Sequence, residues 1–403
     1  MRSSLASASS TRRKRLCIVT PTHWHAFMGG AQYQVKCLLD ELIKMDRYDI
    51  SYIANRISSG YHPKEYQLFS VGSRSPRFGF VTHARPLTHL LERLAPDLIY
   101  QRVACGYTGI AARYAKRHNV KMVWHVAHDS DVTSDKTIHG RNPLRRYLEK
   151  NSVAYGIRHA SCVITQTRDQ AELMERNFAR RADAIVPNFH PAPQEPVDKS
   201  GRPLVVWVAN LKPWKQPEAF VRLAAALADI SDVRFVMVGA LMAEGRDTRW
   251  GESLIRSIDE TENLEYRGST SQTEVNELLA RAHLFVNTSR HEGFANTFIQ
   301  AWMREVPVVS LHVDPDRVLS TRRIGARCGS EDELQRVVRY LLSHEQERRA
   351  LGRTARTYAL EHHSTRNAYR IADLFEEAVG GQHRVNEFPP IRPGMTREER
   401  GHD

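Results

Sequence analysis

The sequence predicts an α/β protein built from two doubly wound domains that face each other across a cleft. Short apolar runs alternate with longer segments of helical periodicity, a pattern typical of a parallel sheet covered by helices on both faces. The alternation begins near residue 16 and starts again near residue 204. Between the two series, residues 190–203 (HPAPQEPVDKSGRP) are rich in proline and polar side chains, which predicts an inter-domain linker. A length of 403 residues fits this division.

Each series predicts five strands. In the first half they lie at 16–20, 50–54, 97–101, 121–126 and 162–165, with helical patterns between them such as 31–44. In the second half strands are expected at 204–209, 233–239, 264–267, 284–287 and 307–311, and helices at 216–229, 273–281, 296–304, 331–342 and 344–359. The carboxyl ends of parallel strands gather at one edge of a sheet, so we expect ligands at the loops that follow them.

Composition excludes several classes of protein. Hydrophobic residues make up 41% and charged residues 26%, which is typical of a soluble domain. No apolar run approaches the roughly 18 residues that cross a bilayer. The five cysteines are odd in number and scattered, so they fit neither a disulfide framework nor a CxxC metal site. They indicate a reducing compartment, and we expect a cytoplasmic protein.

The net charge of +12 is unevenly distributed. Residues 1–15 carry +5 and residues 16–190 carry +9, whereas 191–380 carry −2 and 381–403 are balanced. No apolar run follows the basic cluster of residues 1–15, so this segment does not resemble a secretory signal. We expect residues 1–15 and 381–403 to be disordered tails. Nucleic-acid binding is disfavoured because no nucleic-acid-binding motif accompanies the charge.

Two loops of the first half carry candidate functional residues. Gly29 and Gly30 precede a helix, where paired glycines let the backbone approach a ligand and free amides attract phosphate. An ordinary turn is the alternative, and no GxGxxG fingerprint is present. His125 and His128 lie at and after the end of the strand 121–126, followed by the sequence Asp-Ser-Asp. Such groups can bind substrate hydroxyls or relay protons, and a polar loop without bound metal is the alternative.

Two loops of the second half suit a nucleotide diphosphate. Lys212 and Lys215 lie between a strand and a helix beside Trp214, where two cations suit a diphosphate and a solvated loop is the alternative. The strongest segment is 284–311, in which the loop TSRHEGFAN joins a strand to a helix. The amides of residues 295–297 open that helix toward an anion, Glu292 can accept hydrogen bonds from two sugar hydroxyls, and Gln300 can bond a ribose.

Residues 16–375 resemble family 4 glycosyltransferases, which have the GT-B fold. The matching motifs, in chain order, are Gly29-Gly30-Ala31, Val186-Pro187-Asn188, Tyr266-Arg267-Gly268, Ser289, Glu292-Gly293-Phe294-Ala295-Asn296 and Pro307-Val308-Val309. Residues 360–375 resemble the last helix of the family, which crosses back onto the first domain. The resemblance implies two Rossmann-like domains: an acceptor domain at 16–190 with a returning helix at 361–380, and a nucleotide-sugar domain at 191–360.

Two positions depart from the family pattern. The second glutamate of the signature is Gln300, and the phosphate-binding arginine falls at Asn210. Lys215 matches the family's lysine, and Lys212 is the candidate to replace the missing charge. The histidine that touches the donor sugar matches His128 best, with His125 as the second choice.

The family's reaction moves a sugar from a nucleotide diphosphate sugar to an acceptor hydroxyl with retention of configuration. The resemblance implies such an enzyme in bacterial polysaccharide or glycolipid synthesis, with no metal or other cofactor. It implies Glu292, His128 and Lys215 as catalytic residues. The implied donor-binding residues are Gly29, Gly30, Asn210, Lys212, Gly268, Gly293, Phe294, Ala295, Asn296, Thr297 and Gln300. A non-catalytic sugar-nucleotide-binding protein and a sugar-nucleotide epimerase of the same fold are the alternatives.

The basic first half falls in the implied acceptor domain. It would suit a glycan or lipid-linked glycan acceptor at the inner face of an anionic membrane. The segment 141–158 predicts a helix that could lie on such a membrane, since it combines basic and apolar side chains. These are Arg141, Arg145, Arg146, Lys150 and Arg158 with Leu144, Tyr147 and Leu148. A solvated helix is the alternative.

Overall fold

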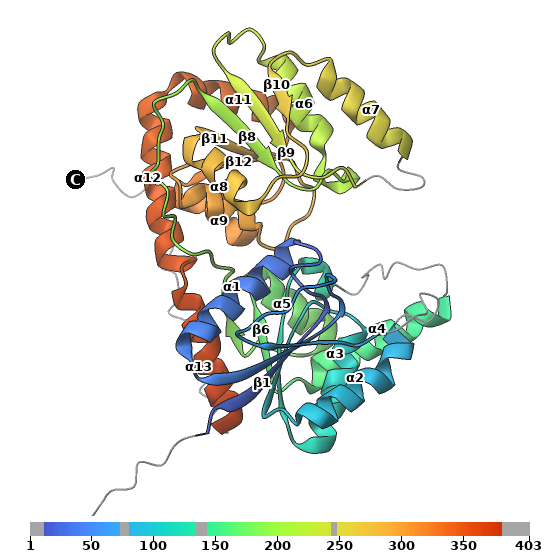
Figure 1. Ribbon diagram of the computed structural model, residues 1–403. Coiled ribbons are helices and arrows are strands. Elements are labelled where there is room, and N and C mark those ends of the chain that lie inside the picture. The colour runs from blue at the N-terminus through green and yellow to red at the C-terminus, as the bar shows by residue number, and fades with distance from the viewer. Residues whose placement is uncertain (1–11, 73–79, 134–142, 243–247, 381–403) are drawn as a thin grey trace, which may run out of the picture.

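The computed structural model describes residues 12–72, 80–133, 143–242 and 248–380 and contains two parallel sheets, each lying between helices (Figure 1). The first sheet has the strand order β3-β2-β1-β4-β5-β6-β7 and the second β10-β9-β8-β11-β12-β13. The strands of the first sheet are β1 (Lys14–Thr22), β2 (Tyr48–Arg56), β3 (Gln67–Ser70), β4 (Leu98–Arg102), β5 (Lys121–His125), β6 (Cys162–Thr165) and β7 (Ala184–Ile185). Those of the second are β8 (Leu204–Val208), β9 (Arg234–Val238), β10 (Leu264–Tyr266), β11 (Leu284–Asn287), β12 (Val308–Ser310) and β13 (Gly325–Arg327).

Helices connect the strands and cover both faces of each sheet, as parallel pairing requires. The first domain contains α1 (Gly30–Met45), α2 (Phe80–Leu94), α3 (Gly106–His118), η1 (Asp129–Asp131), α4 (Pro143–His159) and α5 (Arg168–Phe178). The second contains η2 (Pro213–Lys215), α6 (Pro217–Ala226), α7 (Thr248–Asp259), α8 (Gln272–Arg281), α9 (Asn296–Trp302), η4 (Pro315–Arg317), α10 (Val318–Arg322), α11 (Glu331–Ser343) and α12 (Glu345–His362). The last helix, α13 (Arg366–Gly380), packs on the first domain.

The predicted doubly wound class is confirmed, and all ten predicted strands are present. Sequence periodicity missed β3, β7 and β13, which are two to four residues long and lie at sheet edges. It also missed α7, whose buried residues Gly251, Leu254 and Ile258 follow helical spacing. An edge strand is covered on fewer sides than a central strand, so it does not need the continuous apolar run that marks the central ones.

The structure corrects one expectation about connecting segments and adds a contact to another. The tail predicted at residues 1–15 ends earlier, because Lys14 and Arg15 already pair with Tyr48 and Asp49 in the first sheet. Residues 1–11 and 381–403 lie outside the described residues. The predicted linker at 190–203 is anchored to the second domain: Lys199 Nζ donates to the carbonyls of Leu279, Ala280 and Ala282 at the end of α8. Local composition could not predict these hydrogen bonds, because they join residues that are far apart in the sequence.

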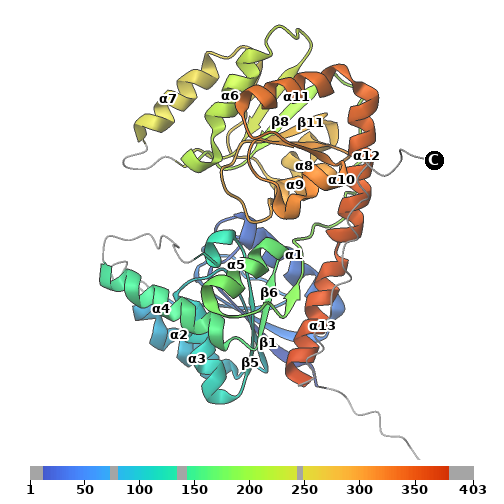
Figure 2. The same ribbon diagram turned by 180° about the vertical axis from the view of Figure 1, so that it is seen from behind.

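Four apolar clusters, one for each face of each sheet, form the core. One cluster of the first domain includes residues of α13. This helix therefore completes a core that is otherwise built from the first half of the chain. In both views, α12 and α13 run along one side of the molecule from the second domain to the first (Figures 1 and 2). Among the described helices, none is both long and apolar enough to cross a bilayer.

Replacing Phe375 with alanine should destabilise the first domain by about 3 to 5 kcal/mol, the usual cost of emptying a buried phenylalanine site. Phe375 is 0% exposed and its ring lies 5.5 Å from that of Tyr100. Urea unfolding followed by circular dichroism measures the effect. Tyr369→Ala is the control on the same helix, because Tyr369 is 46% exposed. Equal unfolding midpoints for the two variants would show that α13 does not complete this core.

Candidate functional site

A buried ion pair lies among the loops at the carboxyl ends of the second sheet. Lys215 Nζ donates to Glu292 Oε1, and Ser289 Oγ donates to the same oxygen at 2.8 Å. The side chains of Lys215 and Glu292 are only 18% and 11% exposed. Burial alone would raise the pKa of Glu292, but the charge of Lys215 and the hydrogen bonds from Lys215 and Ser289 lower it below its ordinary value. Glu292 is therefore a fixed carboxylate at neutral pH.

Backbone and side-chain hydrogen bonds fix the loop that carries Lys215. Thr288 Oγ1 donates to the Lys215 carbonyl at 2.7 Å, and Trp207 Nε1 of β8 donates to the same hydroxyl at 2.9 Å. The amide of Arg290 donates to the Trp214 carbonyl at 2.9 Å. The loops after β8 and β11 therefore form one unit, in which Lys215 and Glu292 are held together.

Lys212 lies in the same loop, with its ammonium 4.8 Å from the centre of the Trp214 ring. Burial and the nearby charge of Lys215 lower the pKa of Lys212. Asn210 lies where the loop begins, and its side chain makes no hydrogen bond to the described residues. The structure thus brings the two lysines close enough for their charges to interact.

Gly268 lies just after β10, an edge strand of the second sheet. Its φ of +63° is in the left-handed region that favours glycine, and its carbonyl accepts the amide of Gly239 at 2.8 Å. A Cβ built on Gly268 meets no described atom within 4 Å, so one side of this turn is open.

His128 reaches the site from the first domain, in the loop after β5. Its Nδ1 accepts the amide of Ser130 at 3.1 Å, so the neutral ring carries its proton on Nε2. Asp131 Oδ2 accepts the amides of Ala127 and His128 at 3.0 and 3.2 Å, which fixes the loop. A Cβ built on Gly293 would lie 3.1 Å from His128 Cα, so the two domains touch beside Glu292.

His125, the second choice from the sequence, occupies a different environment. It is 1% exposed, and its Nδ1 lies 3.0 Å from the hydroxyl of Tyr100. Burial and the adjacent Arg102 lower its pKa well below the ordinary value. Its surroundings are those of a neutral core histidine of the first sheet.

Asn296 joins the two domains. Its Nδ2 donates to the carbonyl of Gly30 at 2.9 Å, and its Oδ1 accepts from Gln34 Nε2 at 3.0 Å and Asn188 Nδ2 at 3.1 Å. The side chain of Asn296 thus bonds the first domain rather than pointing into open space. The sequence placed Asn188 in a family motif but did not identify it as a site residue. It gave no indication of Gln34.

The two glycines at the start of α1 are in close contact with neighbouring side chains. Gly29 has a φ of −104°, and neither Gly29 nor Gly30 is among the residues with positive φ. A Cβ on Gly30 would lie 3.3 Å from Asn296 Nδ2, and one on Gly29 would lie 2.9 Å from the ring of Phe27. Gly30 therefore allows the second domain to approach the start of α1, whereas Gly29 makes room for Phe27 of its own domain.

The remaining residues of the loop fall into two groups. Phe294 is 7% exposed and its ring lies 4.6 Å from that of His363, so its side chain belongs to the core. Ala295 precedes α9, and Thr297 is half-buried in its first turn. The amides of residues 295–297 have no acceptor among the described residues, as is usual at the start of a helix.

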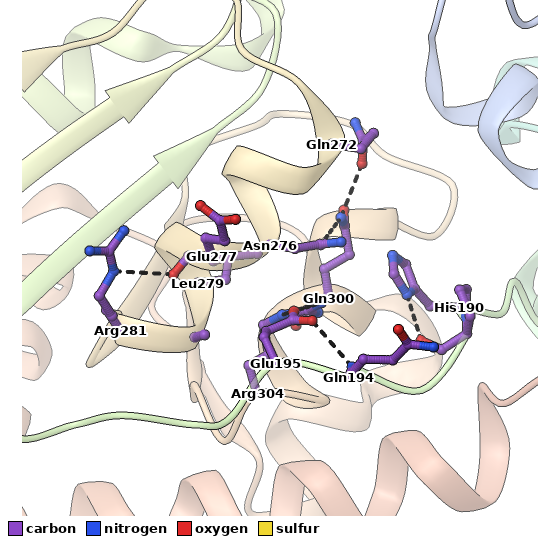
Figure 3. A network of polar contacts seen from close by, with 12 residues as sticks. His190, Gln194, Glu195, Gln272, Asn276, Glu277, Leu279, Arg281, Gln300 and Arg304 are labelled. Atoms are coloured by element: carbon purple, nitrogen blue, oxygen red, sulfur yellow. Dashed lines mark hydrogen bonds and ion pairs between the residues drawn. The ribbon is translucent and has the colours of Figure 1, made fainter.

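Gln300 is held by a neighbouring helix (Figure 3). Its Nε2 donates to Gln272 Oε1 at 3.1 Å and Asn276 Oδ1 at 2.9 Å, both on α8. Its carbonyl accepts from Arg304, which also pairs with Glu195 of the segment 190–203. Both amide protons of Gln300 are therefore used within the protein, and Oε1 is the side-chain atom that can still accept a hydrogen bond.

Replacing Lys215 with methionine should raise the pKa of Glu292 above its value in the wild type. The change removes the opposing charge while the burial that raises the pKa remains. A ¹³C carboxyl titration by NMR measures the shift, with Lys212→Met as the control. In the wild type, Glu292 should stay ionised as the pH falls to its ordinary pKa of 4.5 and gain its proton only below it. The ionised form of Glu292 stabilises the folded protein above pH 4.5, and this contribution is lost as the pH falls from 4.5 through the lowered pKa of Glu292. An unchanged Glu292 pKa in Lys215→Met would contradict the pairing.

Two family models match the chain in succession. The model described as "Glycosyl transferase 4-like domain" matches residues 62–189, and that described as "Glycosyl transferases group 1" matches residues 190–358. The alpha-galactosylglucosyldiacylglycerol synthase of Streptococcus pneumoniae (strain ATCC BAA-255 / R6) is 25% identical over 183 residues, which are 42% of this chain and 48% of that protein. The chain thus matches about half the length of this curated relative.

Solved structures share the fold. Sucrose-phosphate synthase from Thermosynechococcus elongatus has a TM-score of 0.72 at 14% identity, covering 92% of this chain and 100% of the other. Anabaena Alr3699/HepE in complex with UDP-glucose has a TM-score of 0.72 at 16% identity, with 91% and 100% covered. WaaG, a glycosyltransferase involved in lipopolysaccharide biosynthesis, has 0.71 at 15%, with 89% and 99% covered. The chain therefore belongs to the family 4 glycosyltransferases and has their two-domain GT-B fold.

Proposed function

We propose that this glycosyltransferase moves a sugar from a nucleotide diphosphate sugar to an acceptor hydroxyl with retention of configuration, in the synthesis of a bacterial polysaccharide or glycolipid. The observation that carries the proposal is the approach of His128 to the Lys215–Glu292 pair across the domain interface. It brings a cation, a fixed carboxylate and a hydrogen-bond donor into one place, with residues from both domains.

In the proposed mechanism, residues of the second domain stabilise the leaving diphosphate. As the bond to the sugar breaks, negative charge grows on the diphosphate, and preorganised cations and amides lower the energy of that state. Lys215 and Lys212 supply the cations, and the open amides of residues 295–297 supply further donors. In the proposed mechanism these groups do this without a metal or other cofactor, and Gly29 and Gly30 bring the start of α1 close to the same place.

Glu292 and His128 hold the donor sugar from opposite sides. The ionised carboxylate of Glu292 accepts hydrogen bonds from sugar hydroxyls. His128 donates through Nε2, because Nδ1 is already occupied by the amide of Ser130. The two residues come from different domains, so the site is assembled by domain closure, which also excludes water from the donor. Gly268 and Gln300 Oε1 lie where the nucleoside is expected.

Replacing Glu292 with alanine should lower sugar transfer at least about 100-fold, as expected when a positioned charged group is removed from a reacting centre. A screen of nucleotide sugars for thermal stabilisation selects the donor first, beginning with UDP-glucose. Glu277→Ala is the matched control, since Glu277 is exposed on α8.

The variant leaves Lys215 without its partner, so thermal unfolding must be recorded and Glu292→Gln tested beside it. Unchanged transfer by a folded Glu292→Ala would overturn the assignment of the site. Conversion of the nucleotide sugar without an acceptor would favour an epimerase, and donor binding without turnover would favour a non-catalytic binding protein.

We further propose that the acceptor is a lipid-linked glycan at an anionic membrane, with the amino-terminal half of α4 docking on the surface. Leu144 lies one helical turn before Tyr147 and Leu148, and the three side chains are 64%, 64% and 41% exposed. Arg146 and Lys150 are exposed beside them. The other half of α4 packs on α3, and both views show α4 at the flank of the first domain (Figures 1 and 2). Arg141 lies outside the described residues.

The protein should sediment with anionic vesicles at low salt and be released at high salt, because screening weakens the attraction between basic side chains and acidic lipids. Leu144→Glu combined with Tyr147→Glu should abolish this sedimentation. The control is Tyr340→Glu, on an exposed site of the second domain. Sedimentation that salt and the α4 changes leave unaltered would contradict docking by α4.

A further inference from the structure

A carboxylate of the second domain caps a helix of the first. Asp316, in η4, accepts the amide of Arg168 at 3.0 Å through Oδ1 and at 3.1 Å through Oδ2, and the amide of Asp169 at 3.2 Å through Oδ1. In return, the amide of Asp316 donates to Asp169 Oδ2 at 3.3 Å. Each aspartate thus accepts a hydrogen bond from the backbone of the other, across the domain interface.

The capping of α5 is shared between the two domains. The first four amides of a helix lack partners within it. In α5, Thr167 Oγ1 accepts the amide of Gln170 at 3.1 Å, which leaves the amides of Arg168 and Asp169 to Asp316. The negative carboxylate also lies at the positive end of the helix dipole. The cap is therefore complete only when η4 and α5 are adjacent.

The backbone of η4 adopts a conformation that non-glycine residues rarely take. Asp316 and Arg317 have φ values of +49° and +57°, both in the left-handed region. Such residues persist where the surrounding structure holds them, and they concentrate at functional contacts. Asp314, two residues earlier, instead accepts the amides of Leu319 and Ser320 within its own domain. In this turn Asp314 therefore binds the backbone of its own domain, whereas Asp316 binds the backbone of the other domain.

The capped end of α5 supports the loop that carries His128. Gln170, in the first turn of α5, is 0% exposed and donates through Nε2 to Asp129 Oδ1 at 2.9 Å. Its Oε1 accepts the amide of Gln166 at 3.0 Å. A Cβ built on Gly293 would lie 3.0 Å from Gln170 Nε2. The start of α5 therefore touches both the residue after His128 and the residue after Glu292.

We propose that Asp316 is a positioning residue for sugar transfer. By capping α5 of the opposite domain, it holds the arrangement in which His128 and Glu292 face the same donor. The effect on transfer rests on the function proposed above, whereas the capping contact itself does not.

Asp316→Ala should accelerate amide hydrogen exchange in the peptide that contains the first turn of α5. Hydrogen exchange read by mass spectrometry on the full chain measures this without a substrate. Asp316→Asn should restore most of the protection, because the asparagine oxygen also accepts amide hydrogen bonds at a helix start. Asp332→Ala, an exposed site in the second domain, is the control and should match the wild type. Exchange that is equal in Asp316→Ala and the control would overturn the capping contact.

The same variants test positioning. Asp316→Ala should lower kcat/KM for the nucleotide sugar about fivefold, which corresponds to about 1 kcal/mol. Most of the loss should lie in the donor KM, and Asp316→Asn should recover it. Faster exchange with unchanged kcat/KM would overturn the positioning role. If the wild type turns over no nucleotide sugar, the proposed function fails, while the exchange experiment still decides the contact.

Discussion

The side-chain amide of Asn296 makes three hydrogen bonds that hold the second domain against the first. It uses its donor and acceptor on Gly30, Gln34 and Asn188, all in the first domain. Asn188 is itself held by Arg102 at 2.6 Å, so the contact continues into the first sheet. When the domains part, water can replace these partners, and the net cost of losing each bond is only about 1 kcal/mol. Polar contacts of this kind hold the domains in register, and in the proposed mechanism they are released to admit the substrate.

The Lys215–Glu292 pair has a different role from the surface ion pairs of the chain. Removing two charges from water costs about as much as their attraction returns, so a buried pair contributes little to stability. Its value lies in orientation. Ser289 and Thr288 bind the carboxylate and the lysine backbone, so the protein itself holds both charges in place. Charges fixed in advance need no reorganisation when the diphosphate separates, which is the main electrostatic advantage of an enzyme site.

The sequence predicted the positions of strands and helices better than it predicted which residues their side chains contact. Central strands such as β8 and β11 are apolar runs, and the loop from Glu292 to Asn296 follows a strand as expected. Spacing could not show that Asn296 faces the other domain, or that Gln300 is bound by Gln272 and Asn276 from a helix more than 20 residues earlier. These contacts depend on how separate elements pack.

Asp316 was missed for a related reason. In the sequence, Asp-Pro-Asp reads as an ordinary turn, and only the assembled fold shows that the second aspartate lies against α5.

The first domain links the two surfaces that the proposed reaction needs. The carboxyl-terminal half of α4 packs tightly on α3, since a Cβ on Gly109 would lie 2.2 Å from the carbonyl of Ser152 and one on Gly156 would lie 2.6 Å from that of Thr108. Such close backbone contact leaves little space between the two helices, and α3 packs in turn on β5, the strand that precedes the loop of His128. A membrane contact at the other half of α4 would then fix the orientation of the whole first domain. In the proposed function the second domain, whose contacts with the first include those of Asn296 and Asp316, opens for donor exchange while the acceptor side stays docked.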